Sequence, residues 1–292
     1  MTMATRPDDD SFAGHDLHTP NRPVLLSVPH AGRDYPDEIL RQARVSPAIL
    51  QRLEDRYVDL LTRDAIAAGF PCIIARRPRA WIDLNRAERE IDVAMVDGLD
   101  AADVDPPSAK VRGGLGLVPR WLGTGGELWR GRLPRAHLEQ RIARDHAPYH
   151  AQIAQTLDAM QARFGSALLL DVHSMPSLRF PADRIPRIVI GDRFGRSAAN
   201  RFASLALDHA RSAGFVAALN HPYAGGHILA RHGQPARNIH ALQLECDRAL
   251  YLDARGREPD ADKVGRMAQW VHALALRLEE ELAGRAWLHA AE

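Results

Sequence analysis

The sequence has few cysteines. Only Cys72 and Cys246 occur in 292 residues, and they lie far apart inside apolar runs. A disulfide scaffold or a thiolate metal site needs more cysteines at close spacing. Both kinds of site are therefore excluded, and we expect two buried thiols.

Net charge is also nearly absent. Thirty-eight Lys and Arg against 37 Asp and Glu give a formal charge of +1, so no overall field attracts nucleic acid or an anionic membrane. No run approaches the ~18 apolar residues of a membrane span. We therefore expect a cytoplasmic protein that acts on a small molecule, with neither nucleic acid nor a membrane as partner. Nothing in the sequence indicates its oligomeric state.

Two common functional motifs are missing as well. The Gly-rich stretch 220–227 and Arg231 match neither a Walker loop nor a dinucleotide fingerprint, which disfavours nucleotide binding. No Gly-x-Ser-x-Gly elbow is present, which weakens a serine hydrolase interpretation. The stretch 220–227 is typical either of a flexible substrate loop or of an ordinary surface turn.

What the sequence does have is the composition of a globular α/β protein. Hydrophobic residues make up 46% of it, enough to form a core. Residues 1–20 lack periodicity and are expected to form a flexible N-terminal arm, with order beginning near Pro23, and residues 21–292 to form a single α/β domain. Segment 92–132 is predicted to be a lid, a binding loop or an irregular excursion.

Apolar runs alternate with helical patterns, which predicts an open α/β sheet. Expected strands cover 24–28, 72–75, 80–84, 167–172, 187–191, 215–219 and 241–246, and expected helices cover 46–69, 133–164, 197–213 and 260–282.

Polar residues follow four of the expected strands. In open α/β sheets, ligands bind at the carboxyl ends of the strands, because the loops there converge on one crevice. The residues at these ends are therefore candidates for catalysis or binding. They are His30, the pair Asn85 and Arg86, His173, and Glu245.

Two histidines and one carboxylate form a common catalytic zinc set. The carboxylate candidates Glu54, Asp55 and Asp59 lie on the first expected helix, where Asp55 and Asp59 would share one face. A solvated charged face is the alternative for them. For the two histidines, the alternative is hydrogen bonding without a metal.

Arg86 and Asn85 together suit a substrate carboxylate, since guanidinium and carboxylate form two parallel hydrogen bonds. The alternative is an ion pair of Arg86 with Asp83 or Glu88.

Glu245 can act as a general base and then protonate a leaving amine. The alternative role for Glu245 is a structural ion pair with Arg248. Asp171, two residues before His173, either orients an imidazole or a loop, or caps the end of a strand.

Five segments between residues 23 and 253 resemble, in order, the motifs of the N-formylglutamate amidohydrolase family. They are 27–32 (SVPHAG), 55–59 (DRYVD), 83–86 (DLNR), 171–176 (DVHSMP) and 244–251 (LECDRALY). That family is similar to zinc carboxypeptidases and their deacylase relatives. The resemblance implies a single open, mixed, mostly parallel sheet flanked by helices, with a zinc carboxypeptidase-like (phosphorylase/hydrolase-like) fold.

The resemblance also implies the chemistry. One zinc ion is held by His30 and His173, Glu245 is the catalytic carboxylate, and Asn85 with Arg86 binds the substrate carboxylate. The implied reaction converts N-formyl-L-glutamate and water to L-glutamate and formate, the last step of one route of histidine degradation.

The chain departs from the carboxypeptidase pattern at Arg33, which occupies the position of the usual carboxylate ligand. We therefore expect Asp55 to complete the metal site, with Asp59 and Glu54 as alternatives. The segment around Arg231 resembles the family's substrate loop loosely, which makes Arg231 a candidate for substrate binding.

Two other functions remain open at this point. One is a deacylase or carboxypeptidase-like hydrolase that acts on another N-acyl amino acid or on a peptide. The other is a non-catalytic module that binds acidic metabolites through Arg76, Arg86 and Arg231.

Overall fold

A computed structural model describes residues 11–123, 126–178 and 185–289. The chain divides into two compact units, each assembled from three segments. Unit 1 comprises Met1–Ala13, Pro29–Glu54 and Ile74–Ala151, and unit 2 comprises Gly14–Val28, Asp55–Ile73 and Gln152–Glu292. A single domain over 21–292 stays a prediction.

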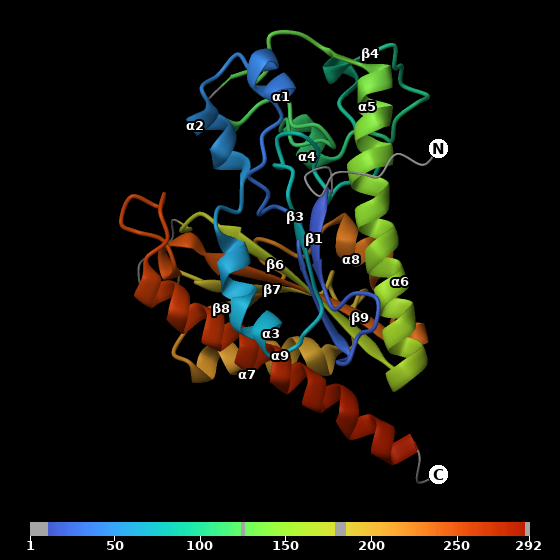
Figure 1. The fold of residues 1–292 in the computed structure, drawn as a ribbon, viewed down its shortest axis with the longest axis vertical. Helices are drawn as coiled ribbons and strands as arrows, with labels where there is room; N and C mark the ends of the chain where they lie inside the picture. Colours follow the sequence, from blue (N-terminus) through green and yellow to red (C-terminus); the bar gives the residue numbers. More distant parts are fainter. Residues whose placement is uncertain (1–10, 124–125, 179–184, 290–292) are drawn as a thin grey trace, which may run out of the picture. The chain divides into compact units, whose positions relative to one another are not determined.

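A seven-stranded sheet forms the centre of unit 2, in the order β1-β3-β2-β6-β9-β7-β8 (Figure 1). The pairs β2–β6, β6–β9 and β7–β8 are parallel, and β7 is antiparallel to β9. The predicted mixed, mostly parallel sheet is thus confirmed. The strands are β1 (Phe12–His15), β2 (Val24–Val28), β3 (Cys72–Ala75), β6 (Ala167–Met175), β7 (Ile188–Gly191), β8 (Ala217–Leu219) and β9 (Ile239–Asp247).

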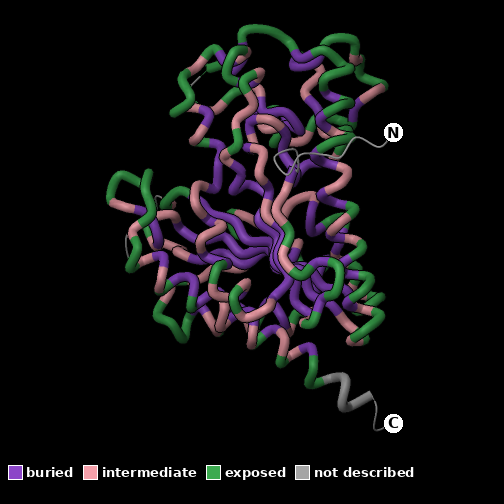
Figure 2. The backbone as a smooth tube through the Cα atoms, in the orientation of Figure 1, coloured by how far each residue is buried: buried purple, intermediate pink, exposed green. Residues whose placement is uncertain are grey.

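The central strands β6 and β9 are buried along their whole lengths (Figure 2). Their apolar residues explain this burial, because a parallel strand in the middle of a sheet is covered on both faces. Polar residues interrupt the runs at alternate positions, so Asp171 and His173 share one face of β6. In register beside them lie Gln243 and Glu245 of β9. The sheet therefore gathers four polar side chains on one face.

Helices pack against this sheet and against each other (Figure 1). The C-terminal helix α9 (Ala261–His289) contacts β2, β6, α3 (Arg63–Ala67) and α7 (Asn200–Ser212), and the short α8 (His227–His232) contacts β6 and β9. The predicted apolar stripe of α9 is buried, with Val264, Met267, Val271, Leu274 and Leu278 at most 3% exposed. None of the described helices is long and apolar enough to cross a membrane.

Unit 1 contains shorter elements. These are α1 (Asp37–Gln42), α2 (Pro47–Leu50), α4 (Ala109–Arg112), the parallel pair β4 (Val96–Asp97) and β5 (Leu133–Pro134), and α5 (Arg135–Arg141). A π-helical turn (Ile142–His146) joins α5 to α6 (Ala147–Phe164), which continues into unit 2. The predicted helix 133–164 is therefore largely confirmed, with a π-turn inside it.

The predicted helix 46–69 is wrong as one element. It begins at Ser46 and Pro47 as expected but breaks into α2, two 3-10 turns (Gln51–Leu53 and Val58–Thr62) and α3. The chain is extended at Glu54 and left-handed at Tyr57, which has φ 60°. Asp55 and Asp59 therefore do not share a helical face. Asp55 instead turns inward, where it is 4% exposed.

Two further predictions need correction. Segment 80–84 is not a strand but a series of turns, in which the Asp83 amide donates to Leu117 O and the Trp81 amide to Pro78 O. Order also begins before Pro23, because β1 lies within the predicted arm. Residues 1–10 of that arm lie outside the described residues. The two cysteines are free and buried, as predicted.

Candidate active site

His173 lies between two carboxylates in unit 2. Its Nδ1 is 2.9 Å from Asp55 Oδ2, and its Nε2 is 2.8 Å from Asp171 Oδ2. Asp171, which is fully buried, also accepts a hydrogen bond of 2.8 Å from the Ser27 hydroxyl. The imidazole is thus fixed at both nitrogens, and its two carboxylate partners have different neighbours.

Those carboxylates change the acidity of the imidazole. Burial disfavours the charged form of His173, but the charge and hydrogen bond of Asp171, the hydrogen bond of Asp55 and the charge of Glu245 raise its pKa well above the usual value. The site therefore favours a positive charge at His173. A proton and a metal cation both satisfy that preference.

Asp55 reaches this site from the extended segment after residue 54. Its second oxygen, Oδ1, accepts a hydrogen bond of 3.3 Å from Arg248 Nη2, and Arg248 Nε also donates to Ser174 Oγ at 3.1 Å. Arg248 follows directly after β9. One carboxylate oxygen thus faces His173 while a guanidinium holds the other.

Glu245 lies on β9 opposite His173 on β6. It is 8% exposed, and its Oε1 accepts a hydrogen bond of 3.0 Å from Gln243 Nε2. Arg248, the alternative partner expected from the sequence, contacts Asp55 and Ser174. Glu245 is therefore a nearly buried carboxylate in register with His173 on the neighbouring strand. The side-chain amide of Gln243, two residues earlier on β9, holds it in place.

His30 in unit 1 shows a matching arrangement. Its Nε2 is 2.7 Å from Asp83 Oδ1, and Asp83 is fully buried. Burial raises the pKa of Asp83, but the guanidinium groups of Arg79 and Arg86, together with His30, hold it well below its usual range. His30 is thus oriented by an ionised carboxylate, and His173 also hydrogen-bonds a buried carboxylate, that of Asp171.

The same Asp83 organises the Asn85–Arg86 turn. Asp83 Oδ1 accepts the Asn85 amide at 2.9 Å, and Arg86 donates from Nε to Leu115 O and from Nη1 to Asn85 O. Arg86 Nε is also 3.8 Å from Asp83 Oδ2, so part of the ion pair named as the alternative is present. In the described part of the chain, no hydrogen bond is found for Arg86 Nη2. That nitrogen can still donate to a ligand.

For the remaining predicted site residues, Glu54, Asp59 and Arg231, the structure shows the following surroundings. Glu54 is fully buried and accepts a hydrogen bond from the Tyr35 hydroxyl in unit 1. Asp59 is half-buried in a 3-10 turn. Arg231 is exposed on α8, and its role in substrate binding stays a prediction.

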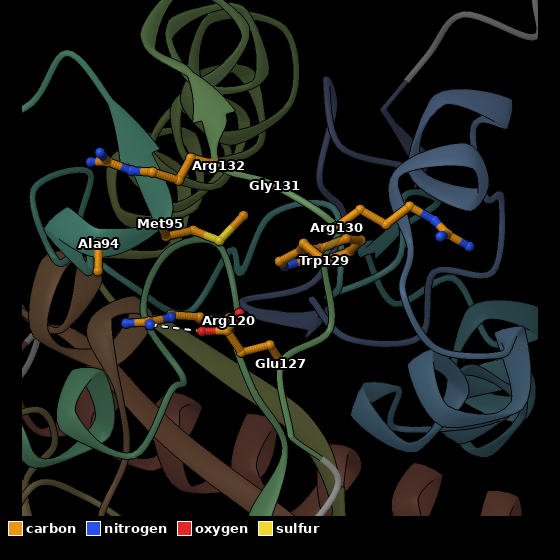
Figure 3. Close-up of a pocket in the computed structure, with 8 residues that line it drawn as sticks. All are labelled: Ala94, Met95, Arg120, Glu127, Trp129, Arg130, Gly131 and Arg132. Carbon is orange, nitrogen blue, oxygen red and sulfur yellow. Dashed lines mark hydrogen bonds and ion pairs between the residues drawn. The ribbon is translucent and has the colours of Figure 1, made fainter.

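Segment 92–132 contributes a small cavity of about 170 Å³ in unit 1 (Figure 3). Arg130 and Arg132 extend from it in opposite directions, and Arg120 is paired with Glu127 and Asp92. Trp129 and Met95 supply its apolar wall. Because its arginines do not converge, this cavity is poorly suited to an acidic substrate.

Comparison with known proteins decides the family. A model of the N-formylglutamate amidohydrolase family matches residues 22–252. This chain belongs to that family. The resemblance of the five sequence motifs is thereby confirmed.

Relatives agree with this assignment. An N-formylglutamate deformylase of Pseudomonas aeruginosa is 31% identical over 79% of this chain and 82% of its own length. One from Pseudomonas putida is 30% identical over 81% and 84%. The crystal structure of N-formylglutamate amidohydrolase from Ralstonia eutropha JMP134 superposes with a TM-score of 0.84 at 30% identity, covering 93% of this chain and 98% of that chain. The chain is thus a hydrolase of the amidohydrolase type.

Sequence reasoning missed several members of the site. Gln243 could have been found from the sequence, because it is a polar residue that interrupts an apolar run two positions before Glu245 on the same strand. For Arg248 the sequence predicts only a pair with Glu245, and the structure adds the contacts with Asp55 and Ser174. His146 and His150, whose Nε2 atoms lie 2.8 Å from Arg86 O and 2.9 Å from Leu84 O, gave no signal, because their partners are backbone atoms.

Proposed function

We propose that this protein is a zinc-dependent amidohydrolase that converts N-formyl-L-glutamate and water to L-glutamate and formate. Membership of the family and the names of its relatives support the reaction. The observation that carries the metal dependence is His173, held between the buried carboxylates of Asp171 and Asp55. His, Asp and Glu side chains are the usual ligands of catalytic zinc.

The proposed zinc ligands are His30, Asp55 and His173. Asp55 and His173 belong to a group of side chains that could hold a metal ion. His30 follows β2, whose Ser27 pairs with Asp171 of β6. Glu54 and Asp59 are the alternatives to Asp55.

The surroundings of both histidines fit a metal. A histidine ligand usually gives its other ring nitrogen to a carboxylate, which sets the tautomer and the ring orientation. Nε2 of His30 is taken by Asp83 and Nε2 of His173 by Asp171. In both residues this makes Nδ1 the nitrogen suited to the ion. Bound zinc would polarise the formyl carbonyl and lower the pKa of the attacking water.

The residues of the chain supply the remaining chemistry. Glu245 accepts a proton from the attacking water and returns it to the nitrogen of the departing glutamate as the C–N bond breaks. Gln243 holds the Glu245 carboxylate in place through its amide. Arg86, with Asn85, binds a substrate carboxylate and so aligns the formyl amide, and Arg231 contributes to substrate binding.

Formate release from N-formyl-L-glutamate tests the reaction, and metal analysis of the purified protein tests the cofactor. We expect about one zinc per chain, loss of formate release on chelation and recovery on adding zinc. Turnover that survives complete metal removal would contradict the zinc proposal. Protein without metal, in which added zinc restores nothing, would instead favour the module that binds acidic metabolites.

The acyl and amino-acid preference needs a panel of substrates. N-formyl-L-glutamate, N-formyl-L-aspartate, N-acetyl-L-glutamate and a short peptide separate a deformylase from a broader deacylase or a carboxypeptidase-like enzyme. We expect the largest kcat/KM for N-formyl-L-glutamate. Faster hydrolysis of the acetyl compound or of the peptide would replace the proposed substrate.

A further inference from the structure

Two buried histidines in unit 1 contact the backbone of the Asn85–Arg86 turn. His146 and His150 are fully buried, and their ring centroids are 4.4 Å apart. His146 ends the π-helical turn, and His150 lies in the first turns of α6. A π-turn inside a helix changes the direction of the side chains near it and often marks a functional site.

The two imidazoles hold the carbonyls on either side of Asn85. His146 Nε2 is 2.8 Å from Arg86 O, and His150 Nε2 is 2.9 Å from Leu84 O. Because a carbonyl oxygen only accepts, both Nε2 atoms must carry a proton. The carbonyl between them, Asn85 O, accepts from Arg86 Nη1, and the Asn85 amide donates to Asp83.

The backbone of the turn is therefore fixed from two directions. Asp83 holds an amide, and the histidines hold two carbonyls that no strand pairing satisfies, since 80–84 is not a strand. A buried carbonyl without a partner is costly, so these hydrogen bonds restrict the conformations open to residues 84–86. The direction of the Arg86 guanidinium depends on this backbone.

We propose that His146 and His150 are positioning residues that keep Asn85 and Arg86 in the geometry that binds a substrate carboxylate. This inference rests on the proposed function of the turn. Neither imidazole needs to touch the substrate. A small displacement of a group that orients the substrate is enough to slow an enzyme strongly, and about 1 Å can cost about 100-fold.

The test compares glutamine with asparagine at each position. The amide nitrogen of glutamine comes close to the place of imidazole Nε2, whereas the shorter asparagine does not reach it. We expect H146N and H150N to raise KM for N-formyl-L-glutamate about 10- to 100-fold and to raise Ki for L-glutamate in parallel. H146Q and H150Q should restore both values to within a few-fold of wild type, and bound zinc should be unchanged in all four variants.

His209 offers a matched control in unit 2. Its Nε2 also hydrogen-bonds a backbone carbonyl, Trp270 O at 3.1 Å, and the ring lies 5.0 Å from Trp270. H209N should lower Tm without changing KM or Ki. His209 is half-buried, so this control separates the general loss of an imidazole hydrogen bond to a backbone carbonyl from the loss of substrate positioning.

The outcomes separate a failure of the proposed enzymatic function from a failure of the positioning role of His146 and His150. If wild-type protein releases no formate from N-formyl-L-glutamate, the proposed function fails. If wild type is active and folded H146N and H150N keep its KM and Ki, the two histidines are merely structural and the inference is overturned. Equal KM values for folded asparagine and glutamine variants overturn it as well.

Discussion

At the scale of single residues, Asp83 contacts both a proposed metal ligand, His30, and the turn proposed to bind the substrate. It accepts hydrogen bonds from His30 Nε2 and the Asn85 amide, and it pairs with Arg79 at 2.8 Å. The proposed metal ligand and the proposed substrate-binding turn therefore share one fully buried carboxylate. Loss of its charge should affect both.

We expect D83N to weaken zinc binding about 10- to 100-fold, since the orienting carboxylate of His30 is lost. It should also raise KM and lower the free energy of unfolding by about 3–5 kcal/mol, because buried guanidinium charge is left unbalanced. Zinc titration, kinetics and urea unfolding measure the three effects. D64N, which alters a surface pair with Arg63, is the control and should change stability by less than about 1 kcal/mol. Unchanged zinc affinity in D83N would separate Asp83 from the metal site.

Glu245 can be tested by changing one atom. E245Q keeps the size of the side chain, but an amide cannot relay a proton. We expect kcat to fall by at least about 100-fold while zinc stays bound. Formate release and metal analysis give the two readings, and E258Q, at an exposed position, is the control. Activity of E245Q near that of wild type would remove Glu245 from the mechanism.

The sequence could predict those site residues that interrupt apolar strands. His173 and Glu245 stand out because a buried strand has no other need for an ionisable group. The contact of Arg248 with Asp55 could not be predicted from the sequence, because the two residues are 193 positions apart in the chain. Asn85 and Arg86 are predicted to follow a strand, but segment 80–84 is not a strand, and their role in substrate binding stays a prediction.

At the scale of elements, burial explains which predictions succeeded. The strands with continuous apolar runs, such as β6 and β9, were found within a few residues, since burial on both faces leaves a clear pattern. The prediction of one continuous helix over 46–69 was wrong, because side-chain contacts outweigh the helical spacing of its apolar residues. Asp55 leaves the helical path to meet His173 and Arg248, which local spacing cannot reveal.

The short helix α8 gives a prediction about acid stability. Its His232 is 3% exposed, and burial, followed by the charges of Arg231 and His227, lowers the pKa of His232 to about 3. In the unfolded chain the pKa is about 6.5. Below that pH the unfolded chain takes up a proton that the folded one refuses. The free energy of unfolding should therefore fall as the pH drops from about 6.5 towards 3, by at most about 1.4 kcal/mol per pH unit from this residue.

Urea unfolding of metal-free protein at pH 7 and pH 5 measures this effect. H232Q cannot take up the proton, so its loss of stability between the two pH values should be smaller than that of wild type. H137Q, at a more exposed histidine of α5, is the control. If wild type and H232Q lose equal stability on acidification, His232 does not contribute.

At the scale of the whole molecule, the proposed zinc ligands come from positions 30, 55 and 173. These residues are far apart in the chain, so a metal that binds all three should bind the folded chain much better than the unfolded one. Such a ligand raises the free energy of unfolding by RT ln(1 + [L]/Kd), about 2.7 kcal/mol at 100 times Kd. Zinc should therefore stabilise the protein as well as activate it.

Calorimetric unfolding with and without zinc measures this stabilisation. We expect chelation to lower Tm of wild type and to abolish formate release, and added zinc to restore both. H173A should bind no zinc, release no formate and show the same Tm with and without the metal, because its ligand set is incomplete. If zinc raises Tm of H173A as much as that of wild type, the metal binds elsewhere in the chain. The coupling between the distant histidines and the fold would then need another explanation.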